Sequence, residues 1–335
     1  MPTPRPNESQ QDFISRCVID PEAVADFPDT DQRIAFCYSQ YERKENKSLT
    51  LKRFDKNKWQ TAFEKQLDIA ERQNIGAVKK FYKDNYNKGI ESFVGSGQTN
   101  YQLLFPTEKL FGLYRQLYIN IGLRFAKWYV NNFDKLLSKA FNTSRYASQW
   151  EASFAAYGSA VAAERVTIVR GTALNTLQRI TRAYLADPEF MSLGTQQQAR
   201  ILRNQFAGIA QWQAERIIRT ESTNIANFAT MQSAQTVFPG ENLIKEWIAS
   251  FDDRTRDSHA EAGASEPIPQ AEPFMVGGSL LMYPGDPSGP AAEVVNCRCS
   301  VAVFPASVDT ANTNIDIVDI GIGLGLGEII SGLEP

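Results

Sequence analysis

The residue types that could carry out chemistry are concentrated between residues 252 and 299. This stretch holds the only histidine of the 335-residue chain, His259, and a C-x-C pair formed by Cys297 and Cys299. Charged and amide side chains that could act with them lie in the same stretch: Asp252, Asp253, Arg254, Arg256, Asp257, Asp286, Asn296 and Arg298. Metal binding, nucleophilic catalysis and a purely structural role are the three interpretations that these residue types allow.

In the metal interpretation, Cys297 and Cys299 are zinc ligands. Side chains alternate along a strand, so both thiols would face the same side, and His259 with Asp257 or Asp252 would complete a tetrahedral site. A structural zinc site usually offers paired C-x2-C knuckles, whereas this chain has a single C-x-C. We therefore expect no cofactor, and keep a structural zinc ion on His259, Cys297 and Cys299 as the less favoured alternative.

In the catalytic interpretation, one of the two cysteines is a nucleophile. His259 would remove its proton, and Asp257 or Asn296 would hold the imidazole in one tautomer. The sequence contains no G-x-S-x-G nucleophile elbow, no G-x-x-x-x-G-K-[ST] phosphate loop and no H-E-x-x-H helix. We therefore expect that the protein is not an enzyme.

The structural interpretation, which we favour, uses the same residues without chemistry. Both cysteines would be small buried residues, and His259 would fix a loop through hydrogen bonds. Arginine–carboxylate pairs are directional and can fasten irregular loops to a helix. The arginines available for this are interspersed with Asp and Glu, and they are Arg216, Arg219, Arg254, Arg256 and Arg298.

The elements that must position these residues are mostly helices. Apolar residues recur every three or four positions through residues 59–82, 110–137 and 150–184, as amphipathic helices require. Gly158 and Gly171 are candidate breaks in the third of these. Residues 195–206 and 212–237 predict two more helices, separated at Gly208. After residue 240, Pro, Gly and Ser become frequent and short runs such as KEWIAS, SLLMY and CSVAVF predict strands.

The predicted fold class is therefore mainly α, with long amphipathic helices forming an extended bundle and a small C-terminal α+β region of short strands and ordered loops. Four segments follow from the pattern: a small helical hairpin module at 1–42, a basic long-helix region at 43–163, a segment at 164–305 with helices over 164–238 and the α+β part over 241–305, and an extended Gly/Ile-rich tail at 306–335.

The hairpin module contains the other two cysteines, Cys17 and Cys37. It reads as two short helices around Pro21 and Pro28, with Asp29 or Thr30 capping the second. The chain begins MPTPRPNESQ, without the features of a signal peptide, which favours a reducing compartment. We therefore expect Cys17 and Cys37 to lie close together as two buried thiols rather than as a disulfide.

Charge is distributed unevenly along the chain. The net charge is −5 over residues 1–42, +7 over 43–90 and −11 over 241–335. A basic centre suggests contact with DNA or with an acidic partner, and the candidate residues are Lys52, Lys56, Lys79, Lys80 and Lys83. No apolar run reaches the roughly 18–20 residues of a membrane span, so we expect no membrane anchor.

Five separated elements of the C-terminal half resemble the phage Mu F-like head morphogenesis (minor capsid protein) domain over about residues 164–304. They are R-T-E in RIIRTESTNIANFATMQSAQ, the tryptophan of KEWIAS, D-x-R-T-R-x-x-H, the P-x-D turn of PGDP and N-C-R-C. The residues that carry the resemblance are Arg219, Thr220, Glu221, Trp247, Asp252 or Asp253, Arg254, Arg256, His259, Asp286, Asn296, Cys297, Arg298 and Cys299.

The resemblance implies a minor structural protein of a tailed-phage head, located in the head interior or at the portal vertex of the virion and assembled in the host cytoplasm. Its implied role is head assembly, with DNA ejection as a further role. The implied partners are the portal protein, the major capsid or scaffolding protein, and packaged DNA. In this family, enzymes are expected only as fused toxin domains.

Three hypotheses from different classes remain open. The first is the portal-bound structural protein, which we favour. The second is a non-specific DNA-binding ejection protein that acts through residues 43–145, whose binding should weaken with salt. The third is a small enzyme built on His259 and one of the cysteines at positions 297 and 299.

Overall fold

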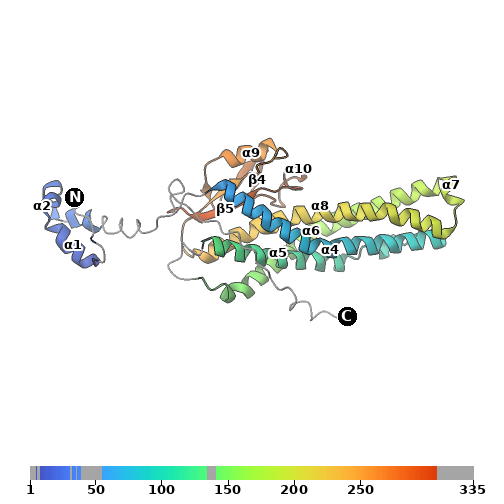
Figure 1. Cartoon of the computed structure of the whole chain (residues 1–335), viewed down its shortest axis with the longest axis horizontal. Coiled ribbons are helices and arrows are strands. Elements are labelled where there is room, and N and C mark those ends of the chain that lie inside the picture. Colours follow the sequence, from blue (N-terminus) through green and yellow to red (C-terminus); the bar gives the residue numbers. More distant parts are fainter. Residues whose placement is uncertain are drawn as a thin grey trace. The chain divides into compact units, whose positions relative to one another are not determined.

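The computed structural model describes residues 5, 8–30, 32–34, 36–38, 55–133 and 141–307. The chain divides into two compact units, with the boundary between residues 54 and 55. The mainly α fold with a small α+β region is confirmed (Figure 1).

The first unit is a set of short helices closed by a disulfide. Helix α1 (Gln10–Val18) is capped by Ser9, and α2 (Pro21–Asp26) is capped by Asp20 with proline at its first position. Asp29 accepts a hydrogen bond from the backbone N–H of Gln32 at 2.9 Å, in agreement with its predicted capping role. Helix α2 is additional to the two helices predicted from the sequence.

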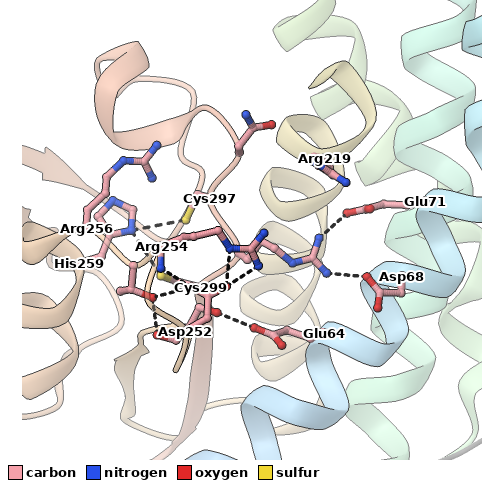
Figure 2. A pocket seen from close by; sticks show the side chains of 14 residues that line it. Glu64, Asp68, Glu71, Arg219, Asp252, Arg254, Arg256, His259, Cys297 and Cys299 are labelled. Atoms are coloured by element: carbon pink, nitrogen blue, oxygen red, sulfur yellow. Dashed lines mark hydrogen bonds and ion pairs between the residues drawn. The ribbon is translucent and has the colours of Figure 1, made fainter. Parts of the chain in front are cut away.

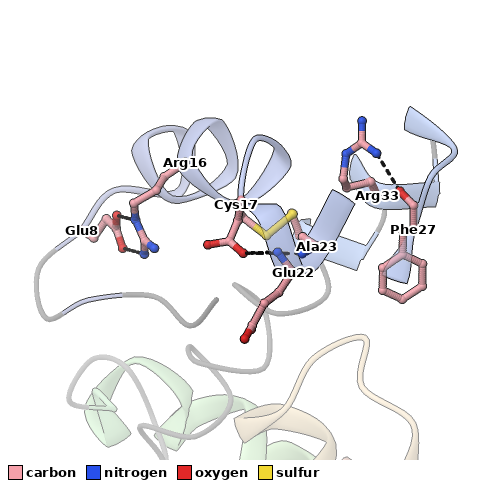
Figure 3. The surroundings of a disulfide bond; sticks show 9 residues. Glu8, Arg16, Cys17, Glu22, Ala23, Phe27 and Arg33 are labelled. Carbon is pink, nitrogen blue, oxygen red and sulfur yellow. Dashed lines mark hydrogen bonds and ion pairs between the residues drawn. A yellow bond between two sulfur atoms is a disulfide. The ribbon is translucent and has the colours of Figure 1, made fainter. Parts of the chain in front are cut away.

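Cys17 and Cys37 form a disulfide, so the prediction of two free thiols is wrong (Figure 3). Their Cα atoms lie 5.9 Å apart, within the range that a disulfide spans. The bonded pair and Phe13 are completely buried and form the core of this unit. A module of this size buries too little apolar surface to be stable alone, and a covalent link compensates for that. The prediction of free thiols was based on the expected reducing compartment and did not consider the small core of this unit.

The second unit is built on four long helices. They are α4 (Lys56–Ser96), α5 (Thr107–Phe133), α6 (Thr143–Leu185) and α8 (Thr195–Val237), with the 3-10 turn η1 (Tyr101–Leu103) after α4 and the short α7 (Pro188–Met191) between α6 and α8. Helix α5 packs along α6 and α8, and α4 packs along α8. None of the described helices is long and apolar enough to cross a membrane.

Helix α8 is continuous, so the predicted interruption at Gly208 is wrong. A single glycine costs a helix about 1 kcal/mol relative to alanine. The buried stripe Leu202, Phe206, Ala210 and Ala214 continues past it in register, and packing of that stripe outweighs the cost. The predicted segment boundary between residues 163 and 164 falls inside α6.

Two antiparallel sheets form the C-terminal region of this unit, beside α8 and the first turns of α4 (Figure 1). Strands β1 (Leu243–Ile248), β2 (Ile268–Pro269) and β5 (Ser300–Pro305) are ordered β2-β1-β5, and Trp247 pairs with Val301 in the register of β1 and β5. Strands β3 (Phe274–Val276) and β4 (Ser279–Leu281) form a hairpin. The short helices α9 (Asp257–Ala264) and α10 (Ala291–Val294) complete the region. Of the predicted tail, residues 308–335 lie outside the described residues.

Helices α5 and α6 approach each other closely at Gly158, which was predicted as a break in α6. The helix is unbroken there, and a Cβ atom at Gly158 would lie 2.7 Å from the Cβ of Tyr118 on α5. A Cβ at Gly171, further along the same helix, would meet nothing within 4 Å. The first glycine therefore serves packing, and the second has no packing role.

We expect Gly158→Ala to lower the free energy of unfolding by about 1–3 kcal/mol, because overpacking exceeds the gain in helix propensity. Gly171→Ala is the matched control and should raise it by about 0.5–1 kcal/mol. Urea unfolding of both variants and the wild type measures the two changes. Equal stabilisation by both substitutions would show that α5 and α6 are not in contact at Gly158.

Candidate functional site

Nine of the residues singled out from the sequence line one pocket of about 560 Å³ (Figure 2). The loop after β1, helix α9 and the segment before β5 supply one side of it. Helix α4 supplies the opposite side through Glu64, Asp68 and Glu71, and α8 supplies Arg219. The structure thus brings together residues more than 200 positions apart in the sequence.

His259 and the C-x-C pair form the innermost part of the pocket. The Nδ1 atom of His259 lies 3.3 Å from the Sγ of Cys299 and 3.6 Å from the Sγ of Cys297. All three side chains are buried, and the imidazole packs edge-on against Trp247 with ring centroids 5.2 Å apart. The two cysteines precede β5 rather than lying within a strand, so the predicted strand placement is wrong. Asn296, with a φ of 56°, turns the backbone just before them.

The two thiols have opposite pKa shifts. Hydrogen bonds from Cys297 and His259 lower the pKa of Cys299 to about 5. The hydrogen bond with Cys299 and burial raise the pKa of Cys297. Cys299 is therefore the thiol that more readily ionises, with Cys297 as its donor.

Glu293, and not Asp257 or Asn296, is the partner of the second imidazole nitrogen. Its Oε2 lies 3.1 Å from Nε2 of His259 and accepts a hydrogen bond from the Ser258 hydroxyl at 2.8 Å. The catalytic interpretation had named Asp257 or Asn296 for this position. Glu293 lies on α10, and no spacing in the sequence relates it to His259.

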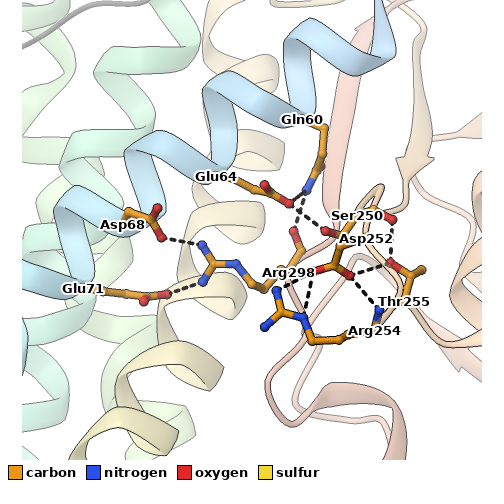
Figure 4. Close-up of polar contacts among 9 residues, drawn as sticks. All are labelled: Gln60, Glu64, Asp68, Glu71, Ser250, Asp252, Arg254, Thr255 and Arg298. Atoms are coloured by element: carbon orange, nitrogen blue, oxygen red, sulfur yellow. Dashed lines mark hydrogen bonds and ion pairs between the residues drawn. The ribbon is translucent and has the colours of Figure 1, made fainter.

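Arg298 fastens this region to helix α4 (Figure 4). Its Nη1 donates to Glu71 Oε1 at 2.9 Å and its Nη2 to Asp68 Oδ1 at 2.6 Å. Burial raises the pKa of Glu71, and the charge of Arg298 opposes that shift. Gln60 Nε2 donates to the backbone carbonyl of Arg298 at 2.8 Å, so the same helix binds both ends of this residue.

The other arginines divide between the predicted carboxylate pairs and other contacts. Arg254 pairs with Asp252 at 2.6 Å, as predicted, which holds the loop after β1. Arg256 instead donates to the carbonyl of Val295 at 2.7 Å. Arg219 lines the pocket, and the guanidinium of Arg216 lies over the Trp212 ring.

Three other predicted motif residues are hydrogen-bonded inside the protein. Asp286 accepts from the N–H groups of Met282 and Ser288 and so fixes the turn after β4. Thr220 accepts from the N–H of Asn296 at 3.2 Å. Glu221 accepts a 2.5 Å hydrogen bond from the Tyr118 hydroxyl, and burial raises the pKa of its carboxyl.

Two buried residues of α8 that were not predicted from the sequence connect that helix to the site. The Thr223 hydroxyl donates to the carbonyl of Cys297 at 2.5 Å. Asn227 donates to the carbonyls of Pro284 and Cys299 and accepts from the N–H of Val301. The sequence offered one signal for them: Thr223 and Asn227 are polar residues four positions apart on a buried helix face.

The predicted lysine contacts that the structure describes lie on α4 and differ in their pairing. The Lys56 ammonium is paired with the buried Glu246 of β1. Lys80 pairs with Asp84 of its own helix at 2.6 Å, while Lys79 and Lys83 are exposed. Lys52 lies outside the described residues.

Removal of the Arg298 side-chain charge should destabilise the second unit. We expect Arg298→Met to lower the free energy of unfolding by about 1–2 kcal/mol, because Glu71, with only 14% of its side chain exposed, loses its cationic partner. Arg254→Met, which removes an exposed pair, should cost no more than about 0.5 kcal/mol. Chemical denaturation compares the two variants, and equal effects would mean that the Arg298 pairs contribute no more than a surface ion pair.

Comparison with known proteins relates the C-terminal half of the chain to one family. Residues 165–302 match the family described as Phage Mu protein F like protein. A stretch of 106 residues is 33% identical to NAD(+)--arginine ADP-ribosyltransferase EFV of Enterococcus faecalis, which covers 28% of this chain and 21% of that protein. The chain thus spans about a fifth of the length of this curated relative. No solved structure matches the chain.

Proposed function

We propose that the protein is a minor structural protein of a tailed-phage head, because residues 165–302 match the family described as Phage Mu protein F like protein. In this proposal it is bound at or near the portal in the procapsid interior, acts in head assembly, and remains in the virion. The family match is the observation that carries the proposal. The matched residues include the whole pocket region except its α4 side.

The contacts of the motif residues support a structural role. Arg298, Arg254 and Asp286 are paired or hydrogen-bonded within the protein, and Glu221 is buried against Tyr118. Side chains that stabilise a junction between helices and sheet are not free to act on a substrate. We therefore propose that the protein has no enzymatic activity. The transferase named above matches over a fifth of its length only, so its activity is not extended to this chain.

Exposed apolar side chains on the second unit offer surfaces for protein partners. Trp212 on α8 and Ile168 on α6 are 55% and 56% exposed and line the same groove. Leu185 and Met191 are exposed near the turn that joins α6 to α8. Clusters of exposed apolar residues are typical of protein interaction sites. In our proposal such surfaces contact the portal or, as further partners, the major capsid or scaffolding protein.

A role in DNA ejection would use the exposed lysines of α4. The pairing of Lys56 with Glu246 and of Lys80 with Asp84 leaves fewer side chains for phosphate than the sequence suggested. DNA binding is therefore a secondary activity in this proposal, and it is expected to be sequence-independent and weakened by salt.

Co-purification of the full chain with the portal protein of the same phage tests the proposal. A second bait, the major capsid protein, and a version truncated before residue 43 map the contact. Binding to the portal, and presence of the protein in mature particles, are expected. Absence from particles together with no affinity for the portal would overturn the proposal.

The Lys79→Gln/Lys80→Gln/Lys83→Gln variant distinguishes the portal-bound structural protein from the DNA-binding ejection protein. It leaves Lys56 and its internal ion pair intact. Portal binding should be unchanged in this variant. Salt-sensitive DNA binding that disappears in the variant, in a protein without portal affinity, would favour the ejection protein instead.

A further inference from the structure

We propose that His259, Cys297 and Cys299 bind a zinc ion, with Glu293 as a positioning residue for the histidine. The Nδ1 atom of His259 and the two Sγ atoms lie within 4.8 Å of one another. Two thiolates and an imidazole are the donors that zinc prefers in proteins. The proposal concerns a site separate from partner binding.

The distances fit ligands around one ion. Zinc bonds of about 2.3 Å to sulfur and 2.0–2.1 Å to nitrogen place tetrahedral ligand atoms roughly 3.5–4 Å apart. The nitrogen–sulfur separations of 3.3 and 3.6 Å are close to this spacing. A small outward movement of the side chains would therefore admit the ion.

The orientation of His259 is set by the carboxylate behind it. Glu293 Oε2 lies 3.1 Å from Nε2, so in the zinc-bound form Nε2 would donate its N–H to Glu293, and Nδ1, which gives up its hydrogen bond to Cys299, would offer its lone pair to the ion. A carboxylate hydrogen-bonded to the distal nitrogen is a common feature of zinc-bound histidine. Ser258 holds the same carboxylate oxygen at 2.8 Å, and a side chain at Gly277 would collide with this carboxylate.

The C-x-C spacing, which weakened the zinc prediction from sequence, is compatible with this geometry. The backbone turns at Asn296, and the next three residues lead into β5, so Cys297 and Cys299 reach the same nitrogen from one segment. Thr223 and Asn227 hold the carbonyls of Cys297 and Cys299 from α8. The two thiols are thus fixed by the scaffold rather than by a paired knuckle.

All three ligands line the pocket, so the fourth position of the ion would be open to it. Among the described residues the ligand group contains only these three members, and neither Asp252 nor Asp257, the fourth ligands considered from sequence, belongs to it. All three members line the 560 Å³ pocket. A water molecule therefore completes the tetrahedron, and the ion ties α9 to the segment before β5.

The test measures zinc in the full-length protein. Protein purified under reducing conditions is expected to contain one zinc per chain by elemental mass spectrometry. Cobalt(II) used as a replacement probe should give the thiolate charge-transfer and ligand-field bands of a tetrahedral sulfur site. The variants Cys297→Ala, Cys299→Ala and His259→Gln should each lose stoichiometric metal. The Cys17→Ser/Cys37→Ser variant, which removes the other two cysteines, is the matched control and should retain the metal.

The role of Glu293 has a separate readout. Glu293→Ala should weaken zinc binding by about 10–100-fold in competition with a chromophoric chelator, while the cobalt spectrum keeps its sulfur bands. Zinc should also raise the melting temperature of the wild type and leave the Cys297→Ala/Cys299→Ala variant unchanged. The melting curve distinguishes loss of metal from misfolding, because a folded Cys297→Ala/Cys299→Ala variant still unfolds in a cooperative thermal transition.

Two results would overturn the proposal. One is a reduced wild-type protein that binds no stoichiometric zinc or cobalt at micromolar concentrations. The other is a metal content that survives all three ligand substitutions. Portal binding is measured independently, so failure of the zinc site leaves the proposed assembly role standing, and the reverse also holds.

Discussion

Replacement of Asn227 by leucine is expected to lower the free energy of unfolding of the second unit by about 3–5 kcal/mol. Asn227 is completely buried on α8 and uses both ends of its amide. The Nδ2 group lies 2.9 Å from the carbonyl of Pro284 and 3.1 Å from that of Cys299. The Oδ1 atom accepts from the N–H of Val301 at 2.8 Å.

The size of this effect comes from groups that the substitution leaves buried without partners. Leucine has a similar volume but neither donates nor accepts, so two backbone carbonyls and one N–H lose a hydrogen bond. Each unsatisfied buried group costs about 1–3 kcal/mol. The three lost contacts connect α8 to the turn before Asp286, to the cysteine segment and to β5, so the damage falls on the junction between helices and sheet.

Equilibrium unfolding in urea measures the change, with Asn204→Leu as the matched control. Asn204 is an exposed residue of the same helix, and its substitution should change stability by less than about 0.5 kcal/mol. Hydrogen exchange of the Val301 amide should accelerate in the Asn227 variant. If both variants unfold at the same urea concentration, the Asn227 hydrogen bonds do not hold the junction.

The long helices could be predicted from the sequence because their signal is local. Apolar residues at helical spacing marked α4, α5, α6 and α8. Single glycines were overweighted as breaks, since Gly158 and Gly208 both lie inside continuous helices. Whether a glycine ends a helix or lets another helix approach depends on the packing partner, and the sequence does not specify that partner.

Only the side of the candidate site formed by residues 252–299 could be predicted from the sequence. His259, Cys297, Cys299 and Arg298 stand close in sequence to other reactive residue types, which made the cluster visible. Glu71, on the opposite wall of the pocket, precedes its partner Arg298 by 227 residues, and nothing in its own surroundings distinguishes it from a solvated helix residue. Long-range pairing of this kind is a property of the tertiary fold.

Glu221 was predicted as a motif residue, and its burial gives it a second, measurable property. It is 4% exposed and accepts a hydrogen bond from the Tyr118 hydroxyl, which itself accepts from Asn224 Nδ2 at 2.7 Å. Tyr114, Tyr157 and Arg165 are the other titratable groups that interact with it. Burial raises the pKa of its carboxyl above the ordinary value of 4.5, and the hydrogen bond from Tyr118 and the charge of Arg165 only partly oppose that shift.

The raised pKa determines the sign of the pH dependence. The folded protein holds the Glu221 proton more tightly than the unfolded chain does, so the contribution of this group to stability is greatest below pH 4.5. That contribution falls as the pH rises from 4.5 through the folded-state pKa, because only the unfolded carboxyl ionises freely in this window. Glu221→Gln keeps an oxygen acceptor for Tyr118 and removes the titration.

We therefore expect Glu221→Gln to gain stability relative to the wild type as the pH is raised from 4.5 to 8. Glu221→Leu lacks the same titrating group, so it should show the same pH dependence as Glu221→Gln and be about 2–3 kcal/mol less stable than that variant at every pH, because the Tyr118 hydroxyl is left buried without an acceptor. Urea unfolding of the three proteins at several pH values separates the two effects, since contributions from all other titrating groups cancel in the differences. A glutamine variant that becomes less stable than the wild type as the pH rises would mean that the ionised carboxylate is the stabilised form, with Arg165 as its counter-ion. Such a result would reverse the assignment of Glu221 from a buried hydrogen-bond acceptor to a member of an ion pair between α6 and α8.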